Sequence, residues 1–284
     1  MKNYFTRILV PVLFNDDDAA VTRKATEIAN DLSCDIFLLH VQNPSRKIAF
    51  VYEEHSSSPA DAVVADEIEM YMAGLVDRHR SGMADGLLVE GMVLQGNWPT
   101  IMKEVIITHH IDLVIIPGPN KKYFDQLTRQ ININWLSQQT QCPLLTMTPD
   151  FEMSHLQNIV VPVNDFLPVR KLTAASFLAR KFNAVVHLVG HQSHSGYDEK
   201  RNANCLAMAY QLLSEYAQVN VYCSFTGESI ASDTLAYAKS VHAGLIVVNS
   251  GKESIRPGWW SRWLGRYLYR EATVPVLTIA PSQQ

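Results

Sequence analysis

A stretch near the C-terminus carries residue types that suit phosphate binding. Residues 247–267 read VVNSGKESIRPGWWSRWLGRY, an apolar strand-like run followed by glycines, cations and tryptophans. Glycine-rich turns between a strand and a helix often hold phosphates, because bare backbone N–H groups and the positive end of the helix dipole both point at the anion. Only glycines at the right positions do this, and the surrounding elements decide which positions those are.

An internal repeat supplies the frame for that decision. Three apolar runs occur twice along the chain, and both copies keep the same order. The pairs are RILVPV at 7–12 with NIVVPV at 158–163, DLVIIP at 112–117 with GLIVVN at 244–249, and CPLLTM at 142–147 with VPVLTI at 274–279. We therefore expect two similar domains, at 1–149 and 155–284, which are called the first and second half below.

Short apolar runs alternate with helical patterns in each half. The runs predicted as strands are 8–12, 35–41, 87–94, 113–117 and 143–147, then 159–163, 185–189, 219–225, 245–248 and 275–279. Helical spacing of Val21, Ala25, Ile28 and Leu32 predicts a first helix, with its cap among residues 16–18. Continuous apolar strands that alternate with helices favour parallel strands covered on both faces. Each half is thus predicted to be an α/β doubly wound unit.

Composition excludes several classes of function. The formal net charge is −4 and charged residues make up 18% of the chain, so no basic excess indicates nucleic-acid binding. The cysteines at 34, 142, 205 and 223 are scattered without zinc or disulfide spacing, which is typical of reduced thiols in the cytoplasm. No apolar run approaches the ~20 residues that a membrane-spanning helix needs. We expect a cytoplasmic protein with no membrane span.

The ordered motifs resemble those of the universal stress protein family in its tandem-domain form, over nearly the whole chain. The motifs that carry this resemblance are ILVPV at 8–12 with its echo IVVPV at 159–163, LLHV at 38–41, DLVII at 112–116 and CPLLTM at 142–147. The resemblance implies two Rossmann-like domains of the adenine nucleotide alpha hydrolase type, each with a five-stranded parallel sheet. It also implies an adenine-nucleotide cleft at the strand C-termini in some members, and pairing of domains through the last strand.

Nucleotide-binding members of that family carry G-x2-G-x9-G-[ST] after the fourth strand and an aspartate after the P-V of the first strand. In the second half, the three glycine positions, the hydroxyl position and the aspartate position are Asn249, Lys252, Arg262, Trp263 and Asn164. In the first half they are Pro117, Asn120, Gln130, Ile131 and Leu13. Side chains at glycine positions hinder close phosphate approach, and proline removes a backbone donor. We therefore predict a degenerate nucleotide site in both domains, with Asp165 displaced by one residue and facing elsewhere.

Other chemistry-bearing residues leave alternatives open. The cations Lys252, Arg256, Arg262 and Arg266 suit either an anion site or an ordinary solvated helix face. The tryptophans at 259, 260 and 263 suit a partner-facing or membrane-facing patch, or a lid packed on their own domain. Among the histidines, His187 is expected in a strand and His191 and His194 in the loop after it, so a shared metal site is not predicted.

The leading hypothesis is a non-catalytic stress-response protein that binds a partner protein or a small ligand and needs no cofactor. Its candidate ligand site comprises Asn164, Asn249, Lys252 and Arg262. One alternative is a protein that binds and weakly hydrolyses ATP through Lys252 and Arg262. Another is a binder of an apolar or anionic metabolite. The repeat also predicts an intramolecular pseudo-dimer in which the last strands of the two halves meet, and a further homodimer is compatible with it.

Overall fold

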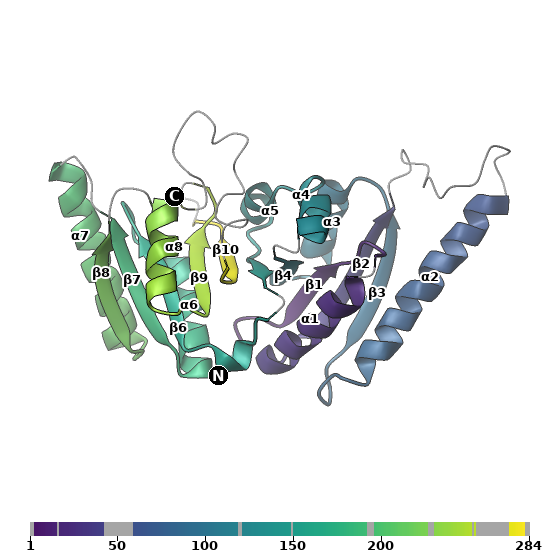
Figure 1. Ribbon diagram of the computed structural model, residues 1–284, viewed down its shortest axis with the longest axis horizontal. Coiled ribbons are helices and arrows are strands. Elements are labelled where there is room, and N and C mark those ends of the chain that lie inside the picture. Colours follow the sequence, from purple (N-terminus) through teal and green to yellow (C-terminus); the bar gives the residue numbers. More distant parts are fainter. Residues whose placement is uncertain are drawn as a thin grey trace. The chain divides into compact units, whose positions relative to one another are not determined.

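The computed structural model describes residues 3–15, 17–42, 59–118, 121–148, 150–191, 196–226, 230–251, 253 and 273–281. Helices and strands alternate through these segments (Figure 1). The chain divides into two compact units, one of Met1–Ile115 with Asp125–Asn132 and the other of Ile116–Phe124 with Ile133–Gln284. None of the helices in the described segments is long and apolar enough to cross a membrane.

The first half has parallel strands in the order β3-β2-β1-β4. Their bounds are β1 (Arg7–Pro11), β2 (Asp35–Gln42), β3 (Val89–Gln95) and β4 (Leu113–Pro117). The helices between and after them are α1 (Asp18–Leu32), α2 (Pro59–Arg80), α3 (Trp98–Thr108) and α4 (Lys121–Thr128). Helix α2 runs alongside the edge strand β3 (Figure 1).

The second unit has the strand order β5-β10-β9-β6-β7-β8. Its strands are β5 (Leu144–Met147), β6 (Asn158–Val163), β7 (Val185–His191), β8 (Val221–Thr226), β9 (Leu245–Asn249) and β10 (Val276–Ile279). Its helical elements are α5 (Ile133–Thr140), η1 (Met153–His155), α6 (Val169–Phe182), α7 (Gly196–Gln211), η2 (Leu212–Tyr216) and α8 (Ile230–Ser240). The pairing of β10 with β5 is antiparallel, whereas the pairs β10–β9, β9–β6, β6–β7 and β7–β8 are parallel.

Helix α1 shows why the predicted apolar stripes form helices. Val21, Ala25, Ile28 and Leu32 are all buried, as the helical spacing predicted. The helix ends at Ser33, whose left-handed backbone (φ 60°) lets its N–H bond the last turn. Asp17 is the N-cap residue, which lies within the predicted range 16–18. Its side chain makes no capping hydrogen bond.

The order β3-β2-β1-β4 in the first half recurs as β8-β7-β6-β9 in the second. In both halves the chain moves outward from its first strand and then returns to that strand's other side, so the prediction of α/β doubly wound units is confirmed. The β5–β10 pairing is the arrangement that the predicted pseudo-dimer requires, and the pseudo-dimer itself stays a prediction. The boundaries 1–149 and 155–284 follow the sequence repeat and also stay a prediction, because the second compact unit takes in α5 and β5.

Candidate functional site

The second-half candidate residues lie where the winding direction of the sheet reverses. Asn164 directly follows β6, and Asn249 is the last residue of β9, the strand that pairs with β6 in parallel. Ligands of open α/β sheets bind beyond the carboxyl ends of the strands at such a switch point. Both asparagine side chains are buried, with 9% of Asn164 and 5% of Asn249 exposed.

The carboxylate of Glu253 joins these two asparagines. Its Oε2 accepts from the backbone N–H of Asn249 at 2.7 Å, and its Oε1 accepts from the side-chain amides of Asn249 at 3.0 Å and Asn164 at 3.3 Å. Lys171 Nζ donates to Oε2 at 2.6 Å. Because Glu253 itself is buried, these bonds replace the water that an ionised carboxylate would otherwise need.

Lys171 belongs to α6 and is fully buried. Its ammonium also donates to the carbonyl oxygen of Pro162, at the end of β6. Burial lowers the pKa of Lys171, and the neighbouring charge of Glu253 acts in the opposite direction. The cluster is therefore a buried ion pair held between a helix and two strand ends.

Two polar atoms near this cluster lack a hydrogen bond among the described residues. They are Asn164 Oδ1 and Ser250 Oγ, both of which are buried. A buried acceptor or hydroxyl without a partner is uncommon in native proteins and asks for an explanation.

In the first half, the backbone donors after β1 are taken by a carboxylate from α1. Asp18, fully buried, accepts from the N–H of Leu13 at 3.0 Å and from the N–H of Asn15 at 2.8 Å. Leu13 stands at the aspartate position of the nucleotide motif, and its side chain is buried. An anion that approached these N–H groups would meet the negative charge of Asp18.

Aromatic side chains gather beyond β1 and β2. The ring of Phe14, whose φ is 54°, lies 3.9 Å from the ring of His40, and Tyr71 and Trp98 have ring centroids 4.9 Å from Phe14 and 6.2 Å from His40. His40 donates from Nδ1 to the carbonyl oxygen of Val12 at 2.8 Å. Burial lowers the pKa of His40 to about 4, so the imidazole is neutral near pH 7.

Neither the protein-family models nor the curated protein sequences contain a match to this chain. Solved structures do match it. The crystal structure of a universal stress protein from Archaeoglobus fulgidus DSM 4304 superposes with a TM-score of 0.73 over 98% of both chains, at 13% sequence identity. The chain has the universal stress protein fold.

Two proteins from Pseudomonas aeruginosa have structures similar to this chain. A functionally unknown protein of strain PAO1 matches with a TM-score of 0.56 and 16% identity, over 98% of this chain and 93% of its own. A protein of strain UCBPP-PA14, provisionally named a universal stress protein, matches with a TM-score of 0.57 and 16% identity, over 98% and 94%. Each match spans both halves, so both take part in the universal stress protein fold.

On this fold, the structure places some predicted residues and leaves others outside the described segments. Asn164 and Asn249 come together through Glu253, whereas Lys252 and Arg262 lie outside the described residues, as do the arginines at 256 and 266 and the tryptophans at 259, 260 and 263. Asp165 is exposed, and the direction of its side chain stays a prediction. The four-residue ligand site therefore stays a prediction.

The sequence reasoning missed Lys171 and Glu253. The sequence did contain one signal for Lys171, because this cation stands at the first position of a buried helical stripe. The other members of the stripe are Ala174, Ala175 and Leu178. Glu253 gave no comparable signal, since an isolated glutamate after a strand is ordinarily a solvated loop residue.

One prediction about the histidines was wrong. His191 is not a loop residue but the last residue of β7, because the ladder with β8 continues to the pair His191 and Thr226. His187 bonds the hydroxyl of Tyr237 at 3.2 Å and Oδ1 of Asn158 at 3.1 Å, and His194 lies outside the described residues. Within the described segments, no three side chains of His, Cys, Asp and Glu come close enough to hold a metal ion.

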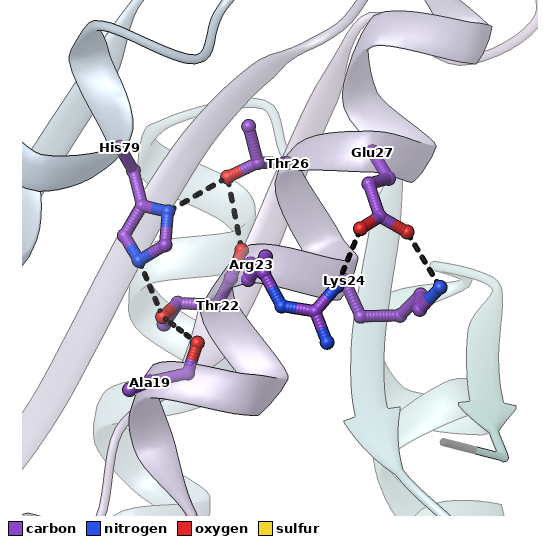
Figure 2. A network of polar contacts seen from close by, with 7 residues as sticks. All are labelled: Ala19, Thr22, Arg23, Lys24, Thr26, Glu27 and His79. Atoms are coloured by element: carbon purple, nitrogen blue, oxygen red, sulfur yellow. Dashed lines mark hydrogen bonds and ion pairs between the residues drawn. The ribbon is translucent and has the colours of Figure 1, made fainter. Parts of the chain in front are cut away.

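A polar network links α1 and α2 in the first half (Figure 2). His79 contacts Thr22 Oγ1 through Nε2 at 2.8 Å and Thr26 Oγ1 through Nδ1 at 3.2 Å. Figure 2 also shows Glu27 between Arg23 and Lys24, at 2.7 Å and 2.5 Å. Burial lowers the pKa of His79, and the charges of Arg78 and Arg23 lower it further. The His79 contacts join α1 to α2, the Glu27 pairs lie within α1, and both sets of contacts lie outside the candidate site.

Proposed function

We propose that this chain is a two-domain universal stress protein that acts by binding a partner protein or a small ligand, without catalysis and without ATP at its strand ends. One observation carries the proposal. The backbone N–H of Asn249, at the first glycine position of the nucleotide motif, donates to the buried carboxylate of Glu253. In a nucleotide site of this type, that donor would face the phosphates.

Charge strengthens this argument. Two unit charges of like sign 4 Å apart repel by about 4 kcal/mol at the effective dielectric constant of a protein surface. A phosphate that competed for the donors around Glu253 would be repelled by its carboxylate. Lys171 is the cation that the described contacts place there, and it already pairs with Glu253. In the first half, Asp18 holds the N–H groups of Leu13 and Asn15, and Pro117 has no N–H to offer.

Isothermal titration calorimetry with MgATP tests the proposal on the full-length chain. We expect no binding heat in the micromolar range of ATP concentration. Micromolar affinity would instead favour the ATP-binding alternative, and the variant K252A/R262A would then be expected to abolish that affinity.

A second candidate function, the binding of an apolar metabolite, is favoured by the aromatic cluster of the first half. Phe14 and Tyr71 offer partly exposed ring surfaces, His40 beside them is neutral near pH 7, and the buried ring of Trp98 packs behind His40. Native mass spectrometry of freshly purified protein tests this candidate. A co-purified mass that the variant F14A loses would support it, and a chain that carries no added mass would count against it.

The proposal places the protein in the cytoplasm. Its support is the scattered spacing of the four cysteines, which fits neither a disulfide framework nor a zinc site.

A further inference from the structure

Four hydrogen-bond donors of the second half converge on one carboxylate. They are Lys171 Nζ and the backbone N–H of Asn249 on Oε2 of Glu253, and the side-chain amides of Asn249 and Asn164 on its Oε1. An ionised carboxylate has about four lone-pair positions that accept hydrogen bonds. The donors thus match the acceptor capacity of a carboxylate, with one cation for one anion.

These donors belong to regular elements of the fold. Lys171 lies on α6, Asn249 ends β9 and Asn164 directly follows β6. Each of the three residues is at least nine-tenths buried. The donors are therefore held by the sheet and the helix, whereas the acceptor comes from the segment that follows β9.

We propose that these donors form a carboxylate-binding site that Glu253 occupies as an internal ligand, and that a small external carboxylate can occupy in its place. The site is thus autoinhibited by the chain itself. This inference rests on the proposed function, because it names the chemical class of the small ligand and the residue that competes with it.

The size and charge of the site favour a carboxylate over a phosphate. The described donors place one ammonium group against a planar group with two oxygens. A phosphate carries a larger negative charge and a tetrahedral set of oxygens, and phosphate sites depend on several successive backbone N–H groups or on arginine. Among the described contacts, Glu253 accepts from a single backbone N–H, that of Asn249, and its other donors are two side-chain amides and one ammonium group.

The unpartnered atoms refine the ligand class. Asn164 Oδ1 belongs to the same amide as the Nδ2 that bonds Glu253, and it is buried with no partner among the described residues. Ser250 Oγ, on the residue that follows Asn249, is also buried without a partner among the residues that the structure describes. A ligand with a hydroxyl group on the carbon beside its carboxylate would supply a donor to this acceptor. The inferred class is a small 2-hydroxy carboxylate, for which glycolate is a probe.

Chemical rescue of the full-length variant Glu253→Ala tests the site. We expect this variant to melt below the wild type, and acetate at ten times its Kd to raise the Tm by about 4 °C. Sodium chloride at equal ionic strength should leave the Tm of the variant unchanged. The wild type, in which Glu253 competes for the same donors, should show a smaller acetate-dependent shift than the variant over the same concentrations.

The double variant Lys171→Met/Glu253→Ala is the matched control, because it removes the cation together with the carboxylate. It should fold and should not respond to acetate. An equal response of both variants, or equal melting of E253A in acetate and chloride, would overturn the proposal. So would an E253A chain that stays unfolded in acetate while the double variant folds, because the site then accepts no external carboxylate.

Glycolate sharpens the result and separates this inference from the proposed function. A larger Tm shift with glycolate than with acetate supports the 2-hydroxy class. An equal shift would contradict the 2-hydroxy assignment and leave only the general carboxylate site. The ATP titration of the wild type tests the proposed function independently. ATP binding would contradict the proposed function, whereas a lack of acetate rescue would contradict only the carboxylate site.

Discussion

The two halves make the same backbone bond at the end of the fourth strand, but with different residues. In the first half the N–H of Gly118 donates to the carbonyl oxygen of Met147, and in the second half the N–H of Ser250 donates to that of Ile279 at 2.9 Å. Glycine is needed at 118, because a Cβ there would overlap the oxygen of Met147. Both halves therefore keep this backbone bond, but the chain at 118 approaches its partner too closely for a side chain, whereas the chain at 250 accommodates a serine.

Those side chains give the halves opposite characters. On β2, His40 follows Leu39, the residue that pairs with Pro11 of β1. On β7 of the second half, Gly190 occupies the corresponding position after Val189. The neutral ring of His40 packs among aromatic rings, whereas a Cβ at Gly190 would meet the ring of Phe225 at 2.9 Å. Conversely, the second half contains the fully buried ion pair. One fold thus carries a neutral aromatic cluster in one half and a buried charge pair in the other.

The largest expected effect comes from breaking the buried charge pair. Replacing Lys171 with Met leaves the carboxylate of Glu253 buried without its cation, and we expect a loss of about 3–5 kcal/mol in the free energy of unfolding. The double variant K171M/E253M should lose less than the single variant, because it buries no uncompensated charge. Denaturant unfolding measures both, and a double variant that is less stable than K171M would contradict this view of the pair.

Lys24 in the first half provides the matched control. It is also buried, but its partner Glu27 has 44% of its side chain exposed. Because solvent screens this pair, K24M should lose no more than about 1 kcal/mol. A similar loss for K24M and K171M would mean that burial of the partner carboxylate does not matter.

The next effect concerns the pH dependence that His40 gives the first half. Its pKa falls from an ordinary value of 6.5 to about 4 in the folded protein. Between these values the unfolded chain binds a proton that the folded chain does not, so the free energy of unfolding falls as the pH falls. The loss is at most about 3 kcal/mol in total.

The variant His40→Asn isolates this contribution. An asparagine amide stands where Nδ1 donates to Val12 and does not titrate, so the variant should lose less stability between about pH 7 and pH 4 than the wild type. Burial also lowers the pKa values of His79 and His187, and both remain in the variant, so their contributions cancel in the comparison. Identical pH profiles for the two proteins would show that His40 titrates normally in the folded state.

The sequence predicts the fold well and the site only in part, for a physical reason. β4 has the predicted bounds, because a run such as LVIIP is apolar throughout and its burial follows from local composition. Lys171 and Glu253 are separated by 82 positions, and each alone resembles a solvated surface residue. Their burial is decided by the partner that the fold brings to them, which no local pattern encodes. Phe14 and His40 likewise meet only because β1 and β2 are neighbours.

A smaller effect tests the shared backbone bond. Gly118→Ala adds a Cβ that overlaps the carbonyl oxygen of Met147, and overpacking of this kind typically costs about 1–3 kcal/mol. Ser250→Ala at the corresponding position removes a buried hydroxyl that has no partner in the described part of the chain. We expect S250A to be as stable as the wild type or slightly more stable. A loss in S250A as large as that in G118A would show that the hydroxyl of Ser250 is satisfied.

The smallest effects separate buried from exposed polar contacts within the first half. Thr26→Val removes the hydroxyl that contacts Nδ1 of the buried His79 and should cost about 1 kcal/mol, the usual net contribution of a hydrogen bond. Arg23→Ala removes a neighbouring pair with Glu27 in which both side chains are exposed, and should cost about 0.3–0.5 kcal/mol. Denaturant unfolding at low and high salt distinguishes them, because salt screens only the Arg23 contribution. If the cost of T26V also fell with salt, the His79 contact would be ionic, and the first half would share the dependence on charge that we assign to the second.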